Sequence, residues 1–354
     1  MISFRITPFF KRLAAICVAA LLLTGCDGAG QQSDSDFPLS VTLTCREKPM
    51  GAILKPGSLF TCGKYVLLQD NYRNSDYHFA VFSRRLEYLY FFCKRGNGPE
   101  ECLMPSPVRN VQSDICIIRD HGNDRFSWFE LTDSCAIFRK SVMPPVAGTT
   151  FPFEINMVSP DRLLLRNTGF HSVRRQLWDI KRMTPIDTLP STFDYERRLG
   201  RDFHPEYDDY RITTDGKRFM CAYFFQNCLE FGRIEADHMK ITASRGSTDS
   251  HDLYWFDVEP TSDKYKYNSD FNTVYYEWIA SGLDSFWASC AGVEWGALPD
   301  HHADIIERYS LDGKPEVRYR LSKPVESFVV LPSPRRIVAI NPDLTDDSFL
   351  IFNL

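Results

Sequence analysis

Two adjacent histidines, His301 and His302, are the most metal-like feature of the sequence. Asp300 and Asp304 flank them, so all four side chains are of types that ligate transition metals. Neighbouring residues of an extended chain point to opposite faces, however, and one metal ion can hardly take both imidazoles directly. We therefore expect a solvated loop without a metal site, and we keep His301 and His302 as candidate binding-loop residues.

Two other motifs imitate catalytic or cofactor sites. Ser250, His251 and Asp252 are the residue types of a hydrolase triad. A triad is defined by positions in space, though, and no Gly-x-Ser-x-Gly nucleophile elbow accompanies these residues. Gly96-x-Gly98 lacks the third glycine, the helix and the βαβ context of a dinucleotide site. The sequence therefore assigns no catalytic residue and no cofactor.

Aromatic and acidic residues gather in the long insertions between strand-like segments. Residues 206–210 (EYDDY) offer acidic oxygens for Ca²⁺ or tyrosine rings for a sugar, but they lack EF-hand spacing. We expect Trp278 and Trp287 to fill the core, because large aromatic side chains often do so, and leave Trp255 and Trp295 as loop candidates. Loops held by a rigid scaffold carry most binding functions. The candidate binding-loop residues are Tyr207, Asp208, Asp209, Tyr210, Trp255, Trp295, His301 and His302.

The elements that must position these residues are short β-strands in a repeating order. Each repeat has a strand opened by a charged residue, a polar or glycine-containing turn, and a strand with an aromatic residue near its end. The pairs recur about every 54 residues, close to the period of known propeller blades. The opening residues are Lys64, Asp124, Asp161, Lys217, Asp284 and Arg335. The closing aromatic residues are Phe82, Phe138, Trp178, Phe231, Tyr309 and Phe352.

These repeats predict an all-β fold, a six-bladed β-propeller over residues 39–354. A pair of β-sandwiches is the alternative. Most repeats have a further strand-like run after the aromatic residue, but the last repeat ends at Leu354 without one. Residues 39–45 (LSVTLTC) alternate apolar and polar and belong to no repeat. We therefore expect them to pair with residues 348–353 and close the ring, which removes exposed sheet edges.

Nine of the 11 cysteines lie beyond Cys26. An odd number implies at least one free thiol or an intermolecular bond. Cys93 with Cys102 and Cys221 with Cys228 are the candidate disulfide pairs, and buried free thiols are the alternative. The sequence has no CxxC motif and no Cys/His zinc spacing.

The N-terminus has the order of a secretory signal. Three basic residues precede an apolar run at residues 13–23, which is too short to span a bilayer that needs about 20 residues. The following motif, LTGC at residues 23–26, resembles a bacterial lipoprotein signal. The resemblance implies a signal peptide over residues 1–25, cleavage between Gly25 and Cys26, and a lipid anchor on the Cys26 sulfur. An ordinary cleaved signal peptide is the alternative.

Residues 26–38 are small, polar and acidic, and we interpret them as the lipidated cysteine with a flexible tether. Acidic residues after such a cysteine resemble the surface-export signal of some gut bacteria. Asp27 in this place instead resembles the inner-membrane retention signal of enteric bacteria. We favour the outer membrane, including its outer surface, over the inner membrane.

A blade junction carries a family resemblance. Residues 93–105 read CKRGNGPEECLMP, and the Gly-x-Gly-Pro-x-Glu pattern, followed by an apolar residue and Pro105, resembles the junction in the TolB-like six-bladed β-propeller lipoproteins of Bacteroides-type bacteria. YSLDGKP at residues 309–315 and the closing RRIVAIN and FLIFNL are similar to the last two blades of that family. The resemblance covers most of residues 39–354. It implies a membrane-anchored propeller and brings no catalytic residues.

Charge and composition limit the function. With 41 basic and 46 acidic residues and no basic cluster, nucleic acid is not an expected partner. We predict a lipid-anchored envelope protein whose propeller is a non-catalytic binding or scaffold module for a protein, peptide or glycan. A propeller enzyme acting on glycan or peptide is the alternative, and it would show converging carboxylates or histidines with perturbed pKa values at the channel mouth. A structural envelope component without a pocket is the third hypothesis.

Overall fold

The computed structural model describes residues 36–51, 55–72, 75–110, 113–143, 151–168, 173–190, 210–246, 273–282, 284–300, 302–343 and 348–354. The chain divides into two units, Met1–Ser33 and Asp34–Leu354, and all the described residues belong to the second. The predicted signal peptide, Gly25 and Cys26 lie outside them. Within the described residues, no helix has the length and apolar character needed to cross a membrane.

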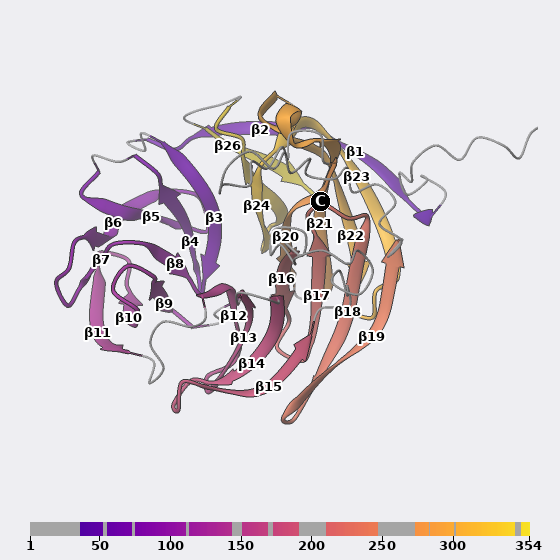
Figure 1. Cartoon of the computed structure of the whole chain (residues 1–354). Helices are drawn as coiled ribbons and strands as arrows, with labels where there is room; N and C mark the ends of the chain where they lie inside the picture. Colours follow the sequence, from indigo (N-terminus) through magenta and orange to yellow (C-terminus); the bar gives the residue numbers. More distant parts are fainter. Residues whose placement is uncertain are drawn as a thin grey trace, which may run out of the picture. The chain divides into compact units, whose positions relative to one another are not determined.

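Six β-sheets follow one another around a ring, which makes the second unit a six-bladed β-propeller, as predicted (Figure 1). Each blade has its first strand on the inside of the ring, and its later strands lie progressively further out. Blade 1 consists of β3 (Pro56–Cys62), β4 (Tyr65–Asp70), β5 (Tyr77–Ser83), β6 (Tyr88–Arg95) and the short parallel β7 (Glu101–Cys102). Blade 2 consists of β8 (Pro105–Pro107), β9 (Ile115–Asp120), β10 (Arg125–Leu131) and β11 (Ala136–Val142). Blade 3 consists of β12 (Phe151–Ser159), β13 (Arg162–Thr168), β14 (Val173–Asp179) and β15 (Thr184–Pro190).

The second half of the ring has the same organisation. Blade 4 consists of β16 (Tyr210–Thr214), β17 (Arg218–Tyr223), β18 (Cys228–Glu235) and β19 (His238–Gly246). Blade 5 consists of β20 (Thr273–Ser281), β21 (Ser285–Glu294), β22 (Ala303–Ser310) and β23 (Pro315–Val325), with a 3₁₀-helix, η3 (Trp295–Asp300), before β22. Blade 6 consists of β24 (Ser327–Pro332), β25 (Arg335–Ile340) and β26 (Ser348–Asn353), to which β2 (Cys45–Pro49) adds the outer strand.

The inner strands of each blade are apolar on both faces because each face packs against a neighbouring blade. β13 shows the pattern. Leu163 and Leu165 belong to the large apolar cluster that includes blade 2, whereas Leu164 packs with Tyr210 and Ile212 of blade 4. Such a strand appears in the sequence as a continuous apolar run rather than as an alternating one.

The sequence repeat corresponds to the second and third strands in five blades, and in blade 2 it is wrong by one strand. Asp124 precedes β10, which is the third strand there, and Phe138 lies in β11, the fourth. The second strand of blade 2 is β9, which pairs with both β8 and β10. A strand-and-turn pattern does not encode how far a strand lies from the centre, because that depends on which strands pair.

Ring closure occurs at the predicted C-terminal strand, but with a later N-terminal segment. β26 pairs antiparallel with β2, so that Cys45 lies opposite Phe352 and Pro49 opposite Ser348. Most of the predicted segment, β1 (Ser40–Leu43), instead adds a parallel strand to β23 of blade 5. The sequence therefore predicted the ring closure but not the interruption at Thr44 between β1 and β2. Because of this interruption, one extended segment adds an outer strand to blade 5 and another to blade 6.

The folded unit also begins earlier than the predicted boundary at residue 39. The ring of Phe37 is buried 5.5 Å from the ring of Tyr309, and the Arg318 guanidinium lies 4.6 Å from the Phe37 ring centre. The tether therefore ends before Phe37. All nine described cysteines are free thiols, including both candidate pairs. Cys221 lies opposite Glu230 in the β17–β18 ladder, so it does not face Cys228.

Candidate functional site

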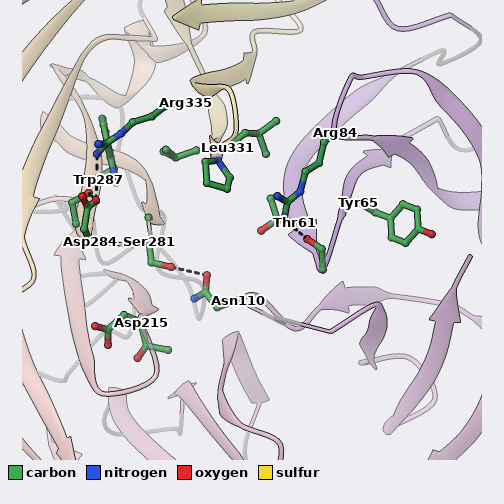
Figure 2. Close-up of a pocket in the computed structure, with 16 residues that line it drawn as sticks. Thr61, Tyr65, Arg84, Asn110, Asp215, Ser281, Asp284, Trp287, Leu331 and Arg335 are labelled. Atoms are coloured by element: carbon green, nitrogen blue, oxygen red, sulfur yellow. Dashed lines mark hydrogen bonds and ion pairs between the residues drawn. The ribbon is translucent and has the colours of Figure 1, made fainter. Parts of the chain in front are cut away.

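A pocket of about 460 Å³ lies where the inner strands of the ring end, within the range of roughly 300–1,000 Å³ that small-molecule sites occupy (Figure 2). Every blade except blade 3 contributes to its lining. The contributions are mostly the turns that follow β3, β16, β20 and β24 and that lead into the second strands. The lining residues are Thr61, Gly63, Tyr65, Arg84, Asn110, Thr214, Asp215, Ser281, Gly282, Asp284, Ser285, Trp287, Val330, Leu331, Pro332 and Arg335.

Asn110 joins four blades at the inner end of this pocket. Its side-chain Nδ2 donates to Asn156 Oδ1 of blade 3 at 2.8 Å and to Thr213 Oγ1 of blade 4 at 3.2 Å. Its Oδ1 accepts from Ser281 Oγ of blade 5 at 2.7 Å (Figure 2). Asn110 has a φ of 60°, a left-handed conformation that asparagine tolerates better than most residues. This amide closes the pocket on the side of the channel.

Aromatic and charged side chains fill the channel beyond Asn110. The Arg109 guanidinium lies 4.3 Å from the Trp278 ring centre, and Phe60 meets Trp278 edge-on at 6.1 Å. Trp278 Nε1 donates to the Phe328 carbonyl at 2.9 Å, which fixes the indole between blades 5 and 6. The remaining cavity here is only about 40 Å³. Trp278 and Trp287 are both buried, as predicted.

Glu154 of blade 3 links two arginines in the same region. Its carboxylate lies 2.9 Å from Arg109 Nη1 and accepts from Arg211 Nη1 at 2.7 Å. Burial alone would raise the pKa of Glu154, but the charges of Arg109 and Arg211 outweigh it and lower this pKa. Burial lowers the pKa of Arg109 to about 10, although Glu154 opposes that change. The pair therefore stays charged at neutral pH, and it forms a plug between the two ends of the channel.

Both carboxylates that line the pocket already have partners. Asp284 accepts from Ser285 Oγ at 3.0 Å and from Arg335 Nη2 at 3.2 Å. Asp215 accepts the backbone N–H groups of Lys217 at 2.8 Å and Arg218 at 2.6 Å, which stabilises the turn between β16 and β17. Neither carboxylate is free to act as a general base on a ligand.

Arg84 is the exception among the charged residues of the pocket. Its Nη2 donates to the Gly63 carbonyl at 3.1 Å, and among the described residues no carboxylate pairs with it. Figure 2 shows its guanidinium beside Thr61, on the side of the pocket opposite Arg335. The described lining includes no His, Cys or Lys side chain. Its groups can therefore donate hydrogen bonds and compensate charge, which suits binding better than acid–base catalysis.

A second polar cluster lies at the opposite end of the inner strands, where blades 5 and 6 meet. His302 precedes β22 and is only 7% exposed. Its Nδ1 lies 2.5 Å from Glu277 Oε1, and its Nε2 lies 3.0 Å from Asp343 Oδ2. Both ring nitrogens therefore have carboxylate partners, one on β20 and one in the segment that follows β25.

The pKa values of His302 and of the neighbouring Glu326 are both raised. Burial would lower the pKa of His302, but the hydrogen bonds and charges of Glu277 and Asp343 outweigh it and raise this pKa to about 9. The pKa of Glu326, directly before β24, is raised by burial and by the charges of Glu277 and Asp343. At neutral pH His302 is therefore a cation held between two carboxylates.

The structure separates the predicted binding-loop residues. His302 is buried in ion pairs rather than solvated, because two carboxylates compensate its charge. The prediction of Tyr210 as a binding-loop residue is wrong, because Tyr210 begins β16 and is fully buried. Its ring centre lies 5.3 Å from that of Tyr223. Trp295 is 40% exposed at the start of η3 and rests on Phe224 at 5.2 Å. The others lie outside the described residues: Tyr207, Asp208, Asp209, Trp255 and His301.

No motif in the sequence indicates the pocket. Arg84 lies in a turn, and Thr61, Asn110 and Ser281 end or follow inner strands, far apart in the chain. The signal that could have revealed them is a polar residue at the same place in successive blades, at the end of the first strand. That signal needs the correct strand order, which the repeat did not provide in blade 2. Within the described residues no three His, Cys, Asp or Glu side chains form a group suited to a metal ion.

Comparison with known proteins supports the architecture. A scan of family models and a search of curated proteins both found no match. A candidate exported protein of Bacteroides fragilis is similar in structure over 89% of this chain and 98% of its own, with 14% identity and a TM-score of 0.56. A DUF4221-family protein of Bacteroides vulgatus is similar over 88% of this chain and 97% of its own, with 11% identity and a TM-score of 0.54.

Identities this low indicate a shared fold alone. The propeller expected from the TolB-like resemblance is therefore confirmed, whereas membership of that family stays a prediction. The chain shares its fold with a candidate exported protein of Bacteroides fragilis and with a DUF4221-family protein of Bacteroides vulgatus.

Proposed function

We propose that this protein is a lipoprotein of the cell envelope, anchored by its lipid to the outer membrane rather than the inner membrane. We further propose that its propeller binds a ligand without catalysis. The observation that carries the binding role is the pocket of about 460 Å³, where polar groups from five blades converge. A rigid ring holds these groups in place before the ligand arrives, so binding costs little conformational entropy.

The anchoring part of the proposal rests on sequence and on analogy. LTGC at residues 23–26 follows a short apolar run, and acidic residues follow Cys26. The similar Bacteroides fragilis structure is of a candidate exported protein, which agrees with a secreted route. An envelope protein, a peptide or a glycan would be the partner.

The alternative of a propeller enzyme has less support. In the cluster around His302, the pKa values of His302 and Glu326 are perturbed as expected of catalytic groups. Both nitrogens of His302 are occupied by carboxylates, though, and the pocket of about 460 Å³ lies at the other end of the inner strands. The cluster therefore suits an electrostatic clamp between two blades.

The test of the binding role is mild cross-linking of the full lipidated protein in its own membranes, followed by affinity purification and mass spectrometry. We expect a partner or a glycan in stoichiometric amount, lost when Ser281 is replaced by a bulky residue that fills the pocket. Recovery of the same partner with the filled pocket would contradict a binding role for the pocket.

The test of the anchor is Cys26→Ala. Without the sulfur no acyl chain can be attached, and each buried CH₂ of such a chain contributes about 0.8 kcal/mol to membrane binding. We expect the variant to move from the membrane to the soluble fraction and to lose incorporation of labelled palmitate. Retention of the variant in the membrane would contradict the proposed anchor.

A further inference from the structure

Among the described residues, Arg84 is the one charged group of the pocket without an oppositely charged partner, and its charge indicates what the pocket binds. Arg335 is neutralised by Asp284, and Asp215 is held by the turn that follows β16. In the described part of the chain, the Arg84 guanidinium has the Gly63 carbonyl as its partner and no carboxylate. The pocket therefore presents one guanidinium face whose charge a ligand can compensate.

The position of Arg84 is fixed by its surroundings. Gly63 has a φ of 51°, and a Cβ there would lie 2.1 Å from Asp114 Oδ1, so no larger residue fits against blade 2. The N–H of Lys64 donates to the same Asp114 oxygen at 3.0 Å. The turn after β3 is thus held by blade 2, and it orients the carbonyl that Arg84 binds. A guanidinium oriented in this way matches a planar carboxylate through two parallel hydrogen bonds.

The rest of the lining has a different character. Thr61 and Ser281 are partly exposed and present hydroxyl groups, whereas Thr214 and Ser285 are buried. Ser281 Oγ donates to Asn110 and can still accept a hydrogen bond from a ligand. Val330 and Pro332 form an apolar wall on the blade 6 side, whereas Leu331 between them is buried in an apolar cluster. Hydroxyl groups opposite an apolar wall suit a sugar ring, which has hydroxyl groups at its edge and C–H groups on its faces.

We propose that the pocket binds a sugar acid, with its carboxylate on Arg84, its hydroxyl groups on Thr61 and Ser281, and one ring face on Val330 and Pro332. The proposal rests on the proposed binding function and names its ligand class. A cavity of about 460 Å³ is larger than a simple anion needs, which favours a whole sugar unit over a free inorganic ion.

The test is calorimetric titration of the full chain in detergent with glucuronate, galacturonate and mannuronate, and with neutral glucose as the matched ligand without charge. We expect at least one of the sugar acids to bind and glucose to bind at least about tenfold more weakly, because a charge-assisted bidentate pair is lost. Arg84→Gln should weaken the sugar acid by at least about tenfold, and Arg84→Lys by less, because lysine keeps the charge and loses the planar fork.

Arg85→Gln is the matched control. Arg85 lies in the same exposed turn and does not line the pocket. Its substitution should leave affinity unchanged, and thermal unfolding of each variant verifies that it is folded. Equal binding of glucose and the sugar acids, or unchanged affinity in Arg84→Gln, would overturn the proposal.

Two further outcomes separate this proposal from the proposed function. Binding of a dipeptide, but of none of the three sugar acids, would overturn the ligand class and leave the binding function intact. Absence of binding by any of these ligands, together with no partner in the membrane cross-linking, would overturn both.

Discussion

Arg84 at one end of the channel has no carboxylate partner among the described residues, whereas His302 at the other end has two. Both are cationic at neutral pH and both belong to polar clusters built from several strands. The first faces a pocket of about 460 Å³, and the second is largely buried between blades. A cation that the fold has already compensated serves stability, while one left uncompensated beside a cavity is available to a ligand.

The charged plug keeps these two ends distinct. Arg109, Glu154 and Arg211 come from three blades, and Arg211 also donates through Nε to the Glu277 carbonyl at 3.3 Å. Glu277 in turn contacts His302, so the plug continues into the clamp and not into the pocket. We therefore expect the ion pairs of the plug (Arg109, Glu154 and Arg211) and of the clamp around His302 to stabilise the fold.

The largest expected effect is that of Glu154→Gln. Removal of this carboxylate leaves Arg109 and Arg211 close together without their shared counter-charge, and breaking a buried ion pair from one side typically costs about 3–5 kcal/mol. We expect the free energy of unfolding to fall by about 3 kcal/mol, since Arg211 is partly exposed. Urea denaturation followed by circular dichroism measures it.

Glu130→Gln provides the control for that experiment. Glu130 pairs with Arg139 on the surface, where both side chains are roughly half exposed. An exposed pair contributes about 0–1 kcal/mol, so the loss should be small. Similar losses in the two variants would remove the distinction between plug and surface.

The next effect is a pH dependence that His302 confers. Its pKa of about 9 in the folded protein exceeds the value of about 6.5 expected in the unfolded chain. The resulting stability is fully present below about pH 6.5 and is lost as the pH rises through 9, a change of roughly 3 kcal/mol. We expect the difference in unfolding free energy between the wild type and His302→Gln to shrink over this interval.

His238→Gln is the matched control for the pH experiment. His238 pairs with Glu235 at 3.2 Å, but both side chains are exposed and the pair joins no blades. Its difference from the wild type should stay near zero across the same interval. A constant difference for His302→Gln would mean that the clamp does not stabilise the fold through its charge.

The six-bladed ring could be predicted from the sequence, but the polar clusters at the two ends of its channel could not. The apolar runs of β4, β13 and β17 identify strands without further information, because blades bury both strand faces. Asp124 misled the alignment because a charged residue can open the second or the third strand of a blade. Tyr210 follows a polar insertion in the sequence, and only the position of β16 reveals that its ring is buried.

The pocket could not be predicted from the sequence for a related reason. Thr61 and Ser281 are ordinary polar residues at strand ends, separated by more than half the chain. They meet because the ring returns to its start. His302 was recognised as a chemically capable residue, but its partners Glu277 and Asp343 are contributed by different blades. Neither carboxylate is near enough in sequence to suggest that it compensates the imidazole.

The smallest expected effect is that of Glu326→Gln, which tests how the charges of the clamp act on a neighbouring carboxylate. Glu326 faces Glu277 and Asp343 as well as His302, and burial together with the two carboxylates raises its pKa above the ordinary value of 4.5. For an acid, a raised pKa in the folded state means that ionisation costs stability as the pH rises above 4.5. We expect Glu326→Gln to stabilise the protein by about 1 kcal/mol or less at pH 7, and not at pH 4.

The sign of that effect depends on His302. Above pH 9 the imidazole becomes neutral and Glu326 loses its most favourable charge interaction, so the stabilisation from Glu326→Gln should increase. The same increase should appear at pH 7 in the His302→Gln background, as a double-mutant cycle would measure. If Glu326→Gln instead destabilises the protein, then the His302 cation also stabilises a third carboxylate, that of Glu326. His302 would then resemble Arg84 in having positive charge that its carboxylate partners do not fully compensate.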